Sequence, residues 1–146
     1  MFKDILFAVD LADGAVQNKA QIKALEASIT YAKAGGATLH VMTIVPDFGM
    51  SIVASYFPEN YEEKVLAEAD KRLHAYVKAN VPKGIKIQHI VGIGTIYKEI
   101  IKHADKVGAD LIVMASHRPE LQDYLLGPNS SQVVRHAKQS VLVVRD

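Results

Sequence analysis

A polar segment that joins two apolar stretches holds the residue types best suited to binding an anion. It follows the apolar run at residues 111–114 and reaches Gly127 and Pro128, where a helix is expected to begin. The first turn of that helix holds Asn129, Ser130 and Ser131. Unpaired N–H groups, the positive end of the helix dipole and serine hydroxyls favour a phosphate there. The same residues also suit ordinary helix capping, so both interpretations stand at this point.

Asp10 is the second candidate, because it follows the first apolar run of the chain. A carboxylate at the end of a strand can accept hydrogen bonds from ribose hydroxyls or bind a metal ion. The next residues, Asp13 and Gly14, are typical of a turn, and an aspartate before a turn often serves only that turn. Asp10 is therefore a candidate ligand-binding residue and a candidate turn residue.

Residue types for covalent or metal chemistry are poorly placed. His117 has no serine or aspartate partner at an interpretable spacing, so we expect no catalytic residue. The histidines at 40, 74, 89, 103 and 136 form no pair at metal-ligand spacing within one element, so we expect no metal site. Neither a P-loop nor a Gly-x-Gly-x-x-Gly motif follows the first apolar run. The pair Gly92 and Gly94 is expected to mark a turn before a helix, with Thr95 as its N-cap.

Composition limits the class of protein. The 146 residues, with 49% hydrophobic content, suit one compact domain. Lysine and arginine total 17 against 16 aspartate and glutamate, which gives no support for a nucleic-acid or anionic-membrane partner. The chain has no cysteine, which excludes disulfides and is compatible with a reducing compartment. No apolar span approaches the length of a transmembrane helix. We therefore expect a cytoplasmic protein with neither nucleic-acid nor membrane partners.

Five apolar runs of strand length alternate with helical patterns, and they lie at residues 5–9, 39–45, 85–91, 111–114 and 141–144. Several are continuously apolar and rich in valine and isoleucine, as in strands buried on both faces of a parallel sheet. We expect one α/β domain over residues 1–146, with a doubly wound, Rossmann-like five-stranded parallel sheet and helices on both faces. Ligands bind such sheets beyond the carboxyl ends of the strands, where the winding reverses.

Apolar spacing also predicts which sides of the helices are buried. The first helix is expected to end at Gly35 and Gly36, the second near Pro82 and the third at Gly108. The expected buried positions of the four helices are, in chain order, Ile22, Leu25, Ile29 and Ala32; Leu66, Ala69, Leu73 and Tyr76; Ile96, Ile100, Ala104 and Val107; and Val133, Val134 and Ala137. The stretch at residues 46–60 mixes apolar side chains with glycine and proline. It is either a flap over a site or a segment that packs on the protein's own edge or on a partner.

Residues 114–137 resemble the nucleotide signature of ATP-binding universal stress proteins, which reads Gly, two residues, Gly, nine residues, and Gly followed by Ser or Thr. Residues 2–10 resemble that family's first strand with its terminal aspartate, residues 39–45 its second strand, and residues 133–145 its last helix and strand. The resemblance spans essentially the whole chain and is strongest to the F and G type subgroup of enteric bacteria. It implies a universal stress protein domain with an adenine nucleotide alpha hydrolase-like fold, and ATP, with or without Mg²⁺, as cofactor.

Carried over position by position, the resemblance implies three groups of ligand-binding residues. They are Ala8, Val9, Asp10, Ile44 and Met114 around the base and ribose; Ser116, His117 and Arg118 near the ribose and phosphates; and Gly127, Asn129, Ser130 and Ser131 in the phosphate cradle. From the residues alone, Ile44 and Met114 are better explained as plain core side chains, and only the resemblance to the family favours a role in binding.

This sequence departs from the family signature in ways that affect the phosphate end. Ala115 and Arg118 occupy the places of the first two glycines, Gly127 comes one residue early, and Pro128 replaces Ser or Thr. Arg118 either donates to the phosphates, which is the preferred interpretation, or fills the space that a phosphate would use. Pro128 removes a hydroxyl and one N–H donor, so we expect weaker affinity than with the intact signature.

Three functions are compatible with these observations. The preferred one is an ATP-binding regulatory or interaction module of the stress response, with partners that the sequence does not identify. The alternatives are a slow ATPase or nucleotidyl-transfer enzyme on the same fold, and a nucleotide-free dimerisation module. The all-apolar strand at residues 141–144 is expected at an edge of the sheet, where pairing with its copy would form a homodimer or larger homo-oligomer, as in similar universal stress proteins. The alternative is that the chain covers this edge itself.

Overall fold

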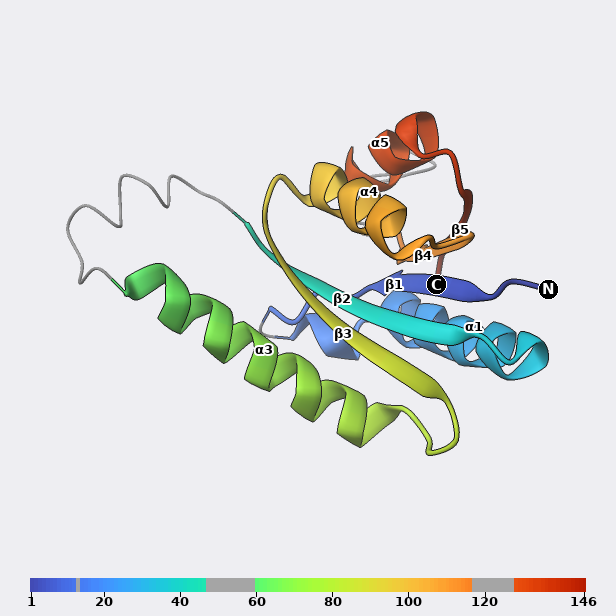
Figure 1. Cartoon of the computed structure of the whole chain (residues 1–146), viewed down its shortest axis with the longest axis horizontal. Coiled ribbons are helices and arrows are strands. Elements are labelled where there is room, and N and C mark those ends of the chain that lie inside the picture. The colour runs from blue at the N-terminus through green and yellow to red at the C-terminus, as the bar shows by residue number, and fades with distance from the viewer. Residues whose placement is uncertain (13, 47–59, 117–127) are drawn as a thin grey trace.

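The sheet expected from the sequence is present, with β1 at its centre. The computed structural model describes residues 1–12, 14–46, 60–116 and 128–146. Five parallel strands lie in the order β3-β2-β1-β4-β5 (Figure 1). They are β1 (Asp4–Ala8), β2 (Thr38–Pro46), β3 (Lys86–Gly94), β4 (Leu111–Ala115) and β5 (Ser140–Val144). The doubly wound α/β class is therefore confirmed, and the order of the strands reverses between β1 and β4.

Helices cover both faces of the sheet in the described residues. One face carries α1 (Lys19–Gly35), which follows the short 3-10 helix η1 (Ala15–Gln17), and α3 (Tyr61–Asn80), and the other carries α4 (Ile96–Val107) and α5 (Pro128–His136) (Figure 1). Alternate residues of β1 serve the two sides, because successive side chains of a strand point to opposite faces. Phe7 packs in the cluster beneath α1 and α3, while Leu6 packs in the cluster beneath α4 and α5.

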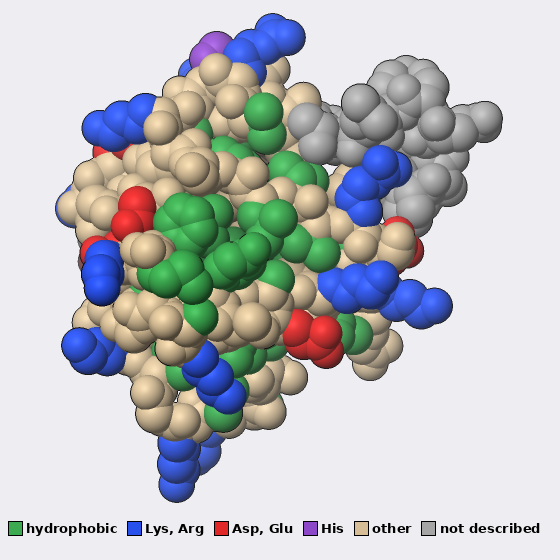
Figure 2. Space-filling model, turned by 90° about the vertical axis from the view of Figure 1, so that its right-hand side faces the viewer, with side chains coloured by type: hydrophobic (Ala, Val, Ile, Leu, Met, Phe, Trp, Pro, Cys, Tyr) green, Lys and Arg blue, Asp and Glu red, His purple; other side chains and the backbone are tan. Residues whose placement is uncertain are grey.

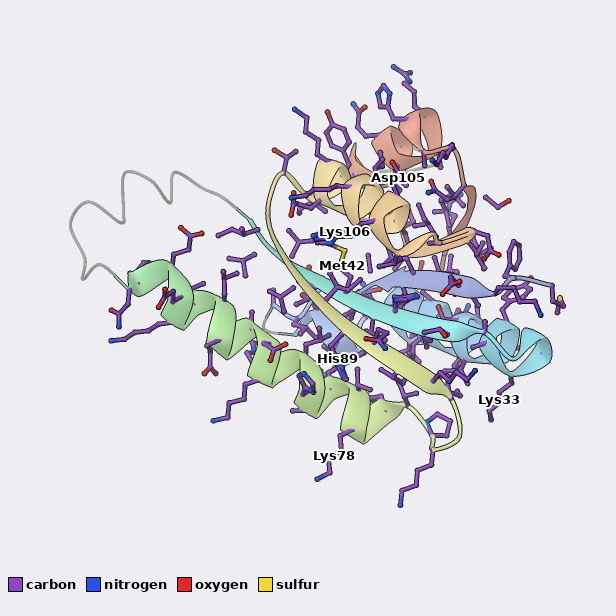
Figure 3. All side chains as sticks on the ribbon, viewed as in Figure 1. Lys33, Met42, Lys78, His89, Asp105 and Lys106 are labelled. Carbon is purple, nitrogen blue, oxygen red and sulfur yellow. The ribbon has the colours of Figure 1, made fainter. Side chains whose placement is uncertain are left out.

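The two clusters fix the positions of the helices. Met42, which reaches from β2 toward α4 in Figure 3, packs in one cluster with Ile100. On the other face, α3 buries Leu73 and Val77 and leaves Tyr76 half-buried. Burial raises the pKa of the Tyr76 phenol to about 12, so this side chain is neutral throughout the physiological range.

The predicted stops of the helices agree with the structure. Gly36 adopts a left-handed conformation with φ 61° directly after α1, and Gly108 does the same with φ 69° after α4. An L-residue rarely adopts this conformation, which is why glycine ends both helices. At the start of α1, the Asn18 side chain accepts hydrogen bonds from the N–H groups of Ala20 and Gln21, as an N-cap residue does.

Two residues expected to be buried are exposed. Ile22 is 45% exposed, because α1 turns Gln21, Ala24, Leu25, Ser28 and Ala32 toward the sheet instead. Val134 is 46% exposed while its neighbour Val133 is fully buried. Consecutive helical residues point about 100° apart, so only one of these two valines can face the core.

The segment at residues 47–59, expected either as a flap or as a packed edge, lies outside the described residues. Within the described part of the chain, no helix is long and apolar enough to cross a membrane.

Candidate functional site

A cavity of about 800 Å³ opens at the carboxyl edge of the sheet, beside the reversal between β1 and β4. Its size and position are those expected of a small-molecule site in an open α/β sheet. The ends of β1, β2 and β4 contribute to its wall, together with α1, α3, the start of α4 and the first turn of α5. Elements that are far apart in the sequence therefore meet around one space.

The apolar part of the wall contains most of the residues expected around a base. Ala8, Val9, Ile44 and Met114 all line the cavity. Val9 and Met114 are buried, and Ile44 is half-buried. Such a wall favours a flat, weakly polar group over a charged one, because an apolar surface returns no hydrogen bonds to a charge.

Asp10 combines the two roles that the sequence left open. Its Oδ1 accepts a hydrogen bond from the N–H of Ala12 at 2.9 Å, which is the contact of a turn residue. The residue is exposed and lines the cavity. The turn therefore orients a carboxylate at the mouth of the cavity.

The first turn of α5 brings two of the expected phosphate-binding residues to the cavity. Asn129 and Ser130 line it, and Ser130 is almost completely buried. Ser116 and Ser131 lie next to lining residues but are not themselves part of the lining. The N–H of Ser116 donates to the carbonyl of Val144 at 2.8 Å, which ties the end of β4 to β5.

His117, Arg118 and Gly127 lie outside the described residues, so their contribution to the phosphate end stays a prediction. Pro128 is the first residue of α5, the position expected for it.

Sequence analysis missed the polar side chains that α1, β2 and α3 add to the lining, which are Gln21, Thr43, Lys64, Glu68 and Arg72. The three on α3 are spaced four residues apart and thus share one side of the helix, a pattern visible in the sequence. Arg72 also donates from Nη2 to the carbonyl of Leu11, beside Asp10. Gln21 gave no comparable signal, because its burial follows from the tertiary fold.

Gly92 and Gly94 lie within the end of β3 and not in a separate turn as expected, and Thr95 alone separates Gly94 from α4. A Cβ at position 92 would lie 2.8 Å from Cε of Met42 and 3.0 Å from Oε1 of Glu99. Glu99 in turn lies 3.6 Å from Nε2 of His103. Burial lowers the pKa of His103, an effect that Glu99 opposes. Thr95 is the N-cap residue of α4 but makes no side-chain capping hydrogen bond.

Among the described residues, no group of three or more His, Cys, Asp or Glu side chains is arranged to hold a metal ion.

Comparison with known proteins decides the family. The model of the universal stress protein family matches residues 1–145. The chain belongs to the universal stress protein family. This agrees with the resemblance seen in the sequence.

Relatives align over almost the full chain. Universal stress protein G of Escherichia coli O157:H7 is 29% identical over 147 residues, covering 99% of this chain and 100% of that protein. The structure of protein MJ0577, from Methanocaldococcus jannaschii, has a TM-score of 0.73 at 24% identity and covers 100% of this chain and 97% of its own. At this identity the likeness shows the fold.

Two further structures of the family contain adenine nucleotides. The universal stress protein of Archaeoglobus fulgidus in complex with dAMP has a TM-score of 0.67 at 17% identity, covering 97% of both chains. A universal stress protein in complex with cAMP has a TM-score of 0.61 at 23% identity, covering 98% of this chain and 96% of its own.

Proposed function

We propose that this universal stress protein binds ATP in the cavity at the carboxyl edge of its sheet. The main support for the proposal is that three kinds of chemical group line one cavity. An apolar wall at Ile44 and Met114, a carboxylate at Asp10 and the first turn of α5 at Asn129 and Ser130 all line the same cavity. These are the groups needed for a base, a ribose and a phosphate chain.

Each part of ATP has a matching partner in this arrangement. The adenine ring packs against the apolar side chains, whose burial from water favours a flat aromatic group. The carboxylate of Asp10 accepts hydrogen bonds from ribose hydroxyls. The phosphates lie near the N-terminal turn of α5, where N–H groups and the helix dipole favour negative charge. Mg²⁺ would enter with the phosphates of ATP. The dAMP and cAMP complexes of other family members support an adenine nucleotide as the ligand.

We further propose that nucleotide binding regulates interactions of the protein during a cytoplasmic stress response. Self-association through β5 belongs to this proposal. β5 pairs only with β4 in the described sheet, and its residues Val141 to Val144 are half-buried. A second copy of the strand would satisfy the open edge and cover its apolar side chains.

The proposal is tested by titrating the purified protein with ATP in a calorimeter, with GTP as the comparison ligand. We expect saturable ATP binding and weaker GTP binding. Asp10→Ala should weaken ATP binding by about 1–3 kcal/mol, the usual cost of losing a hydrogen bond to a buried polar group. Asp105→Ala is the matched control, since Asp105 is on α4 and does not line the cavity.

Two outcomes would contradict parts of the proposal. A flat ATP titration, together with no nucleotide released on denaturing freshly purified protein, would leave the nucleotide-free dimerisation module in its place. An unchanged titration for Asp10→Ala would remove Asp10 from the site. Timed release of ADP in the presence of Mg²⁺ separates a binding protein from a slow ATPase.

A further inference from the structure

The main chain of Asp10 is held at both of its polar groups by one buried side chain. Oε1 of Gln21 accepts a hydrogen bond from the N–H of Asp10 at 2.9 Å. Nε2 of Gln21 donates to the carbonyl of Asp10, also at 2.9 Å. A side-chain amide is suited to this task, because it offers an acceptor and a donor side by side. The reversed amide would place a donor against the N–H of Asp10, so the observed orientation is the one that satisfies both groups.

The second hydrogen of the Gln21 amide is used as well. Nε2 donates to the carbonyl of Ala15 at 2.9 Å, so the amide bridges Asp10 to η1. Gln21 is only 2% exposed. Both of its N–H donors have partners, and none is left to donate to a ligand in the cavity. Its contribution to the site is therefore to the placement of Asp10.

The surroundings of Gln21 make an apolar residue the simpler choice at this position. Its neighbours Ala20, Ala24 and Leu25 pack in the hydrophobic cluster beneath α1. A buried amide loses the hydrogen bonds of water, and this loss is recovered only when every polar atom finds a partner. The three bonds of Gln21 meet that condition and order the loop after β1. Arg72 on α3 adds a contact to the same loop at the carbonyl of Leu11.

We infer that Gln21 is a positioning residue for the nucleotide site, acting through Asp10. The inference rests on the proposed function. By holding both main-chain polar groups of Asp10, Gln21 fixes where its carboxylate lies at the mouth of the cavity. Without the amide the loop gains freedom, and part of the binding free energy must be spent on ordering it.

The test compares Gln21→Met with a matched control in the same helix. Ser28 is also buried and polar on α1, but its hydroxyl donates to the carbonyl of Ala24 at 2.8 Å and makes no contact with the loop. We expect Gln21→Met to weaken ATP binding about tenfold in calorimetry, and Ser28→Ala to leave it unchanged. Thermal unfolding of both variants monitors the fold.

A double-mutant cycle separates positioning from direct contact. If Gln21 acts through Asp10, the variant with both Gln21→Met and Asp10→Ala should bind ATP no more weakly than Asp10→Ala alone. Additive losses would overturn the inference, because Gln21 would then contribute to ATP binding on its own. Binding by Gln21→Met at the level of the unmodified protein would overturn it too.

Amide hydrogen exchange tests the hydrogen bonds between Gln21 and the main chain of Asp10 in the unmodified protein. This measurement does not require that any variant folds. The N–H of Asp10 donates to a buried acceptor, so its exchange should be strongly slowed. Exchange at the rate of an exposed loop amide would overturn the inference. A flat ATP titration of the unmodified protein would overturn the proposed function, and this assignment with it. If the unmodified protein binds ATP and Gln21→Met binds it equally well, only the assignment of Gln21 is overturned, and the proposed function stands.

Discussion

The imidazole rings of His74 and His89 stack, with their centroids 3.6 Å apart and their planes 18° from parallel. His74 is on α3 and His89, labelled in Figure 3, is on β3, so the stack links the long helix to the edge strand of the described sheet. Burial lowers the pKa of His89 below its ordinary value of 6.5, and positive charge on His74 lowers it further. Asp70, which lies 3.5 Å from Nε2 of His74, acts in the opposite direction.

This pair predicts a loss of stability on acidification. The folded state binds a proton at His89 less readily than the unfolded chain does. The stability that neutral His89 contributes is therefore fully present above the pKa of histidine in the unfolded chain and is lost as the pH falls below it. We expect the Tm to decrease between pH 7.5 and 5.5 and His89→Phe, which keeps an aromatic ring, to reduce that decrease. His136→Gln on the exposed end of α5 is the control. An equal decrease in Tm for His89→Phe and the unmodified protein would show that the stack is not responsible.

Asn129 allows the phosphate end of the site to be tested apart from the base end. Asn129→Ala should weaken ATP binding by about 1.5–3 kcal/mol, the range for hydrogen bonds to charged groups, and should leave adenosine binding unchanged. Alanine suits a helix at least as well as asparagine, so the fold should not suffer. Parallel titrations with ATP and adenosine measure the difference. Equal losses for both ligands would place Asn129 away from the phosphates.

Replacing Gly35 by alanine should destabilise the protein, although helix propensity alone predicts the opposite. A Cβ at this position would lie 2.6 Å from the carbonyl oxygen of Phe2 and 3.0 Å from Cβ of Met1. Alanine is the better helix former, yet Gly35→Ala should destabilise the protein by about 1–3 kcal/mol, because the first residues must move to admit the methyl group. Urea denaturation measures this. Lys33→Ala, an exposed change in the same turn, should be close to neutral, and a neutral Gly35→Ala would contradict the packing of the N-terminus on α1.

The proposed self-association through β5 can be tested at its centre. Val143→Pro removes a main-chain donor and fixes φ in the middle of the strand, which should prevent pairing with a second copy. Light scattering should show dimers or larger species for the unmodified protein and monomers for the variant. Because the change can also disturb pairing with β4, circular dichroism is needed to show that the variant folds. An unmodified protein that is monomeric at tens of micromolar would refute the idea.

The surface offers a second reason to measure assembly. On the face of the molecule shown in Figure 2, hydrophobic side chains gather near the middle, and most of the lysine and arginine side chains lie farther out. This is the side of the N-terminus and the end of α1 in Figure 1. There Met1 is 73% exposed and Tyr31 is 37% exposed, with the ring of Tyr31 in edge contact with Phe2.

The elements of the fold could be predicted because their signals are local. Runs of valine and isoleucine marked the strands, and glycines that adopt positive φ marked the ends of α1 and α4. The burial of α1 was less predictable, since Ile22 faces solvent while Gln21 and Ser28 face the core. Polar residues can occupy such positions when their hydrogen bonds are completed by backbone groups, and sequence periodicity does not reveal those partners.

In the candidate site too, some residues could be predicted from the sequence and others could not. Asp10, Asn129 and Ser130 stood out because they follow strand and helix signals, and the structure brings them to one cavity. Lys64 and Arg72 reach the same cavity from α3 only through the packing of that helix on the sheet.

The seam where β1 and β4 pair also affects when the chain can first bind a ligand during its synthesis. Across this seam the carboxylate of Asp110 accepts hydrogen bonds from the N–H groups of Lys3 and Asp4, which are 107 and 106 residues away along the chain. Contacts over such separations form late, because a long loop must close before they stabilise anything. During synthesis, the first three strands can assemble while the ribosome is still adding β4 and α5. The cavity lacks Met114, Ala115, Asn129 and Ser130 until those elements emerge, so a nascent chain would gain its ligand last, as the sheet is completed.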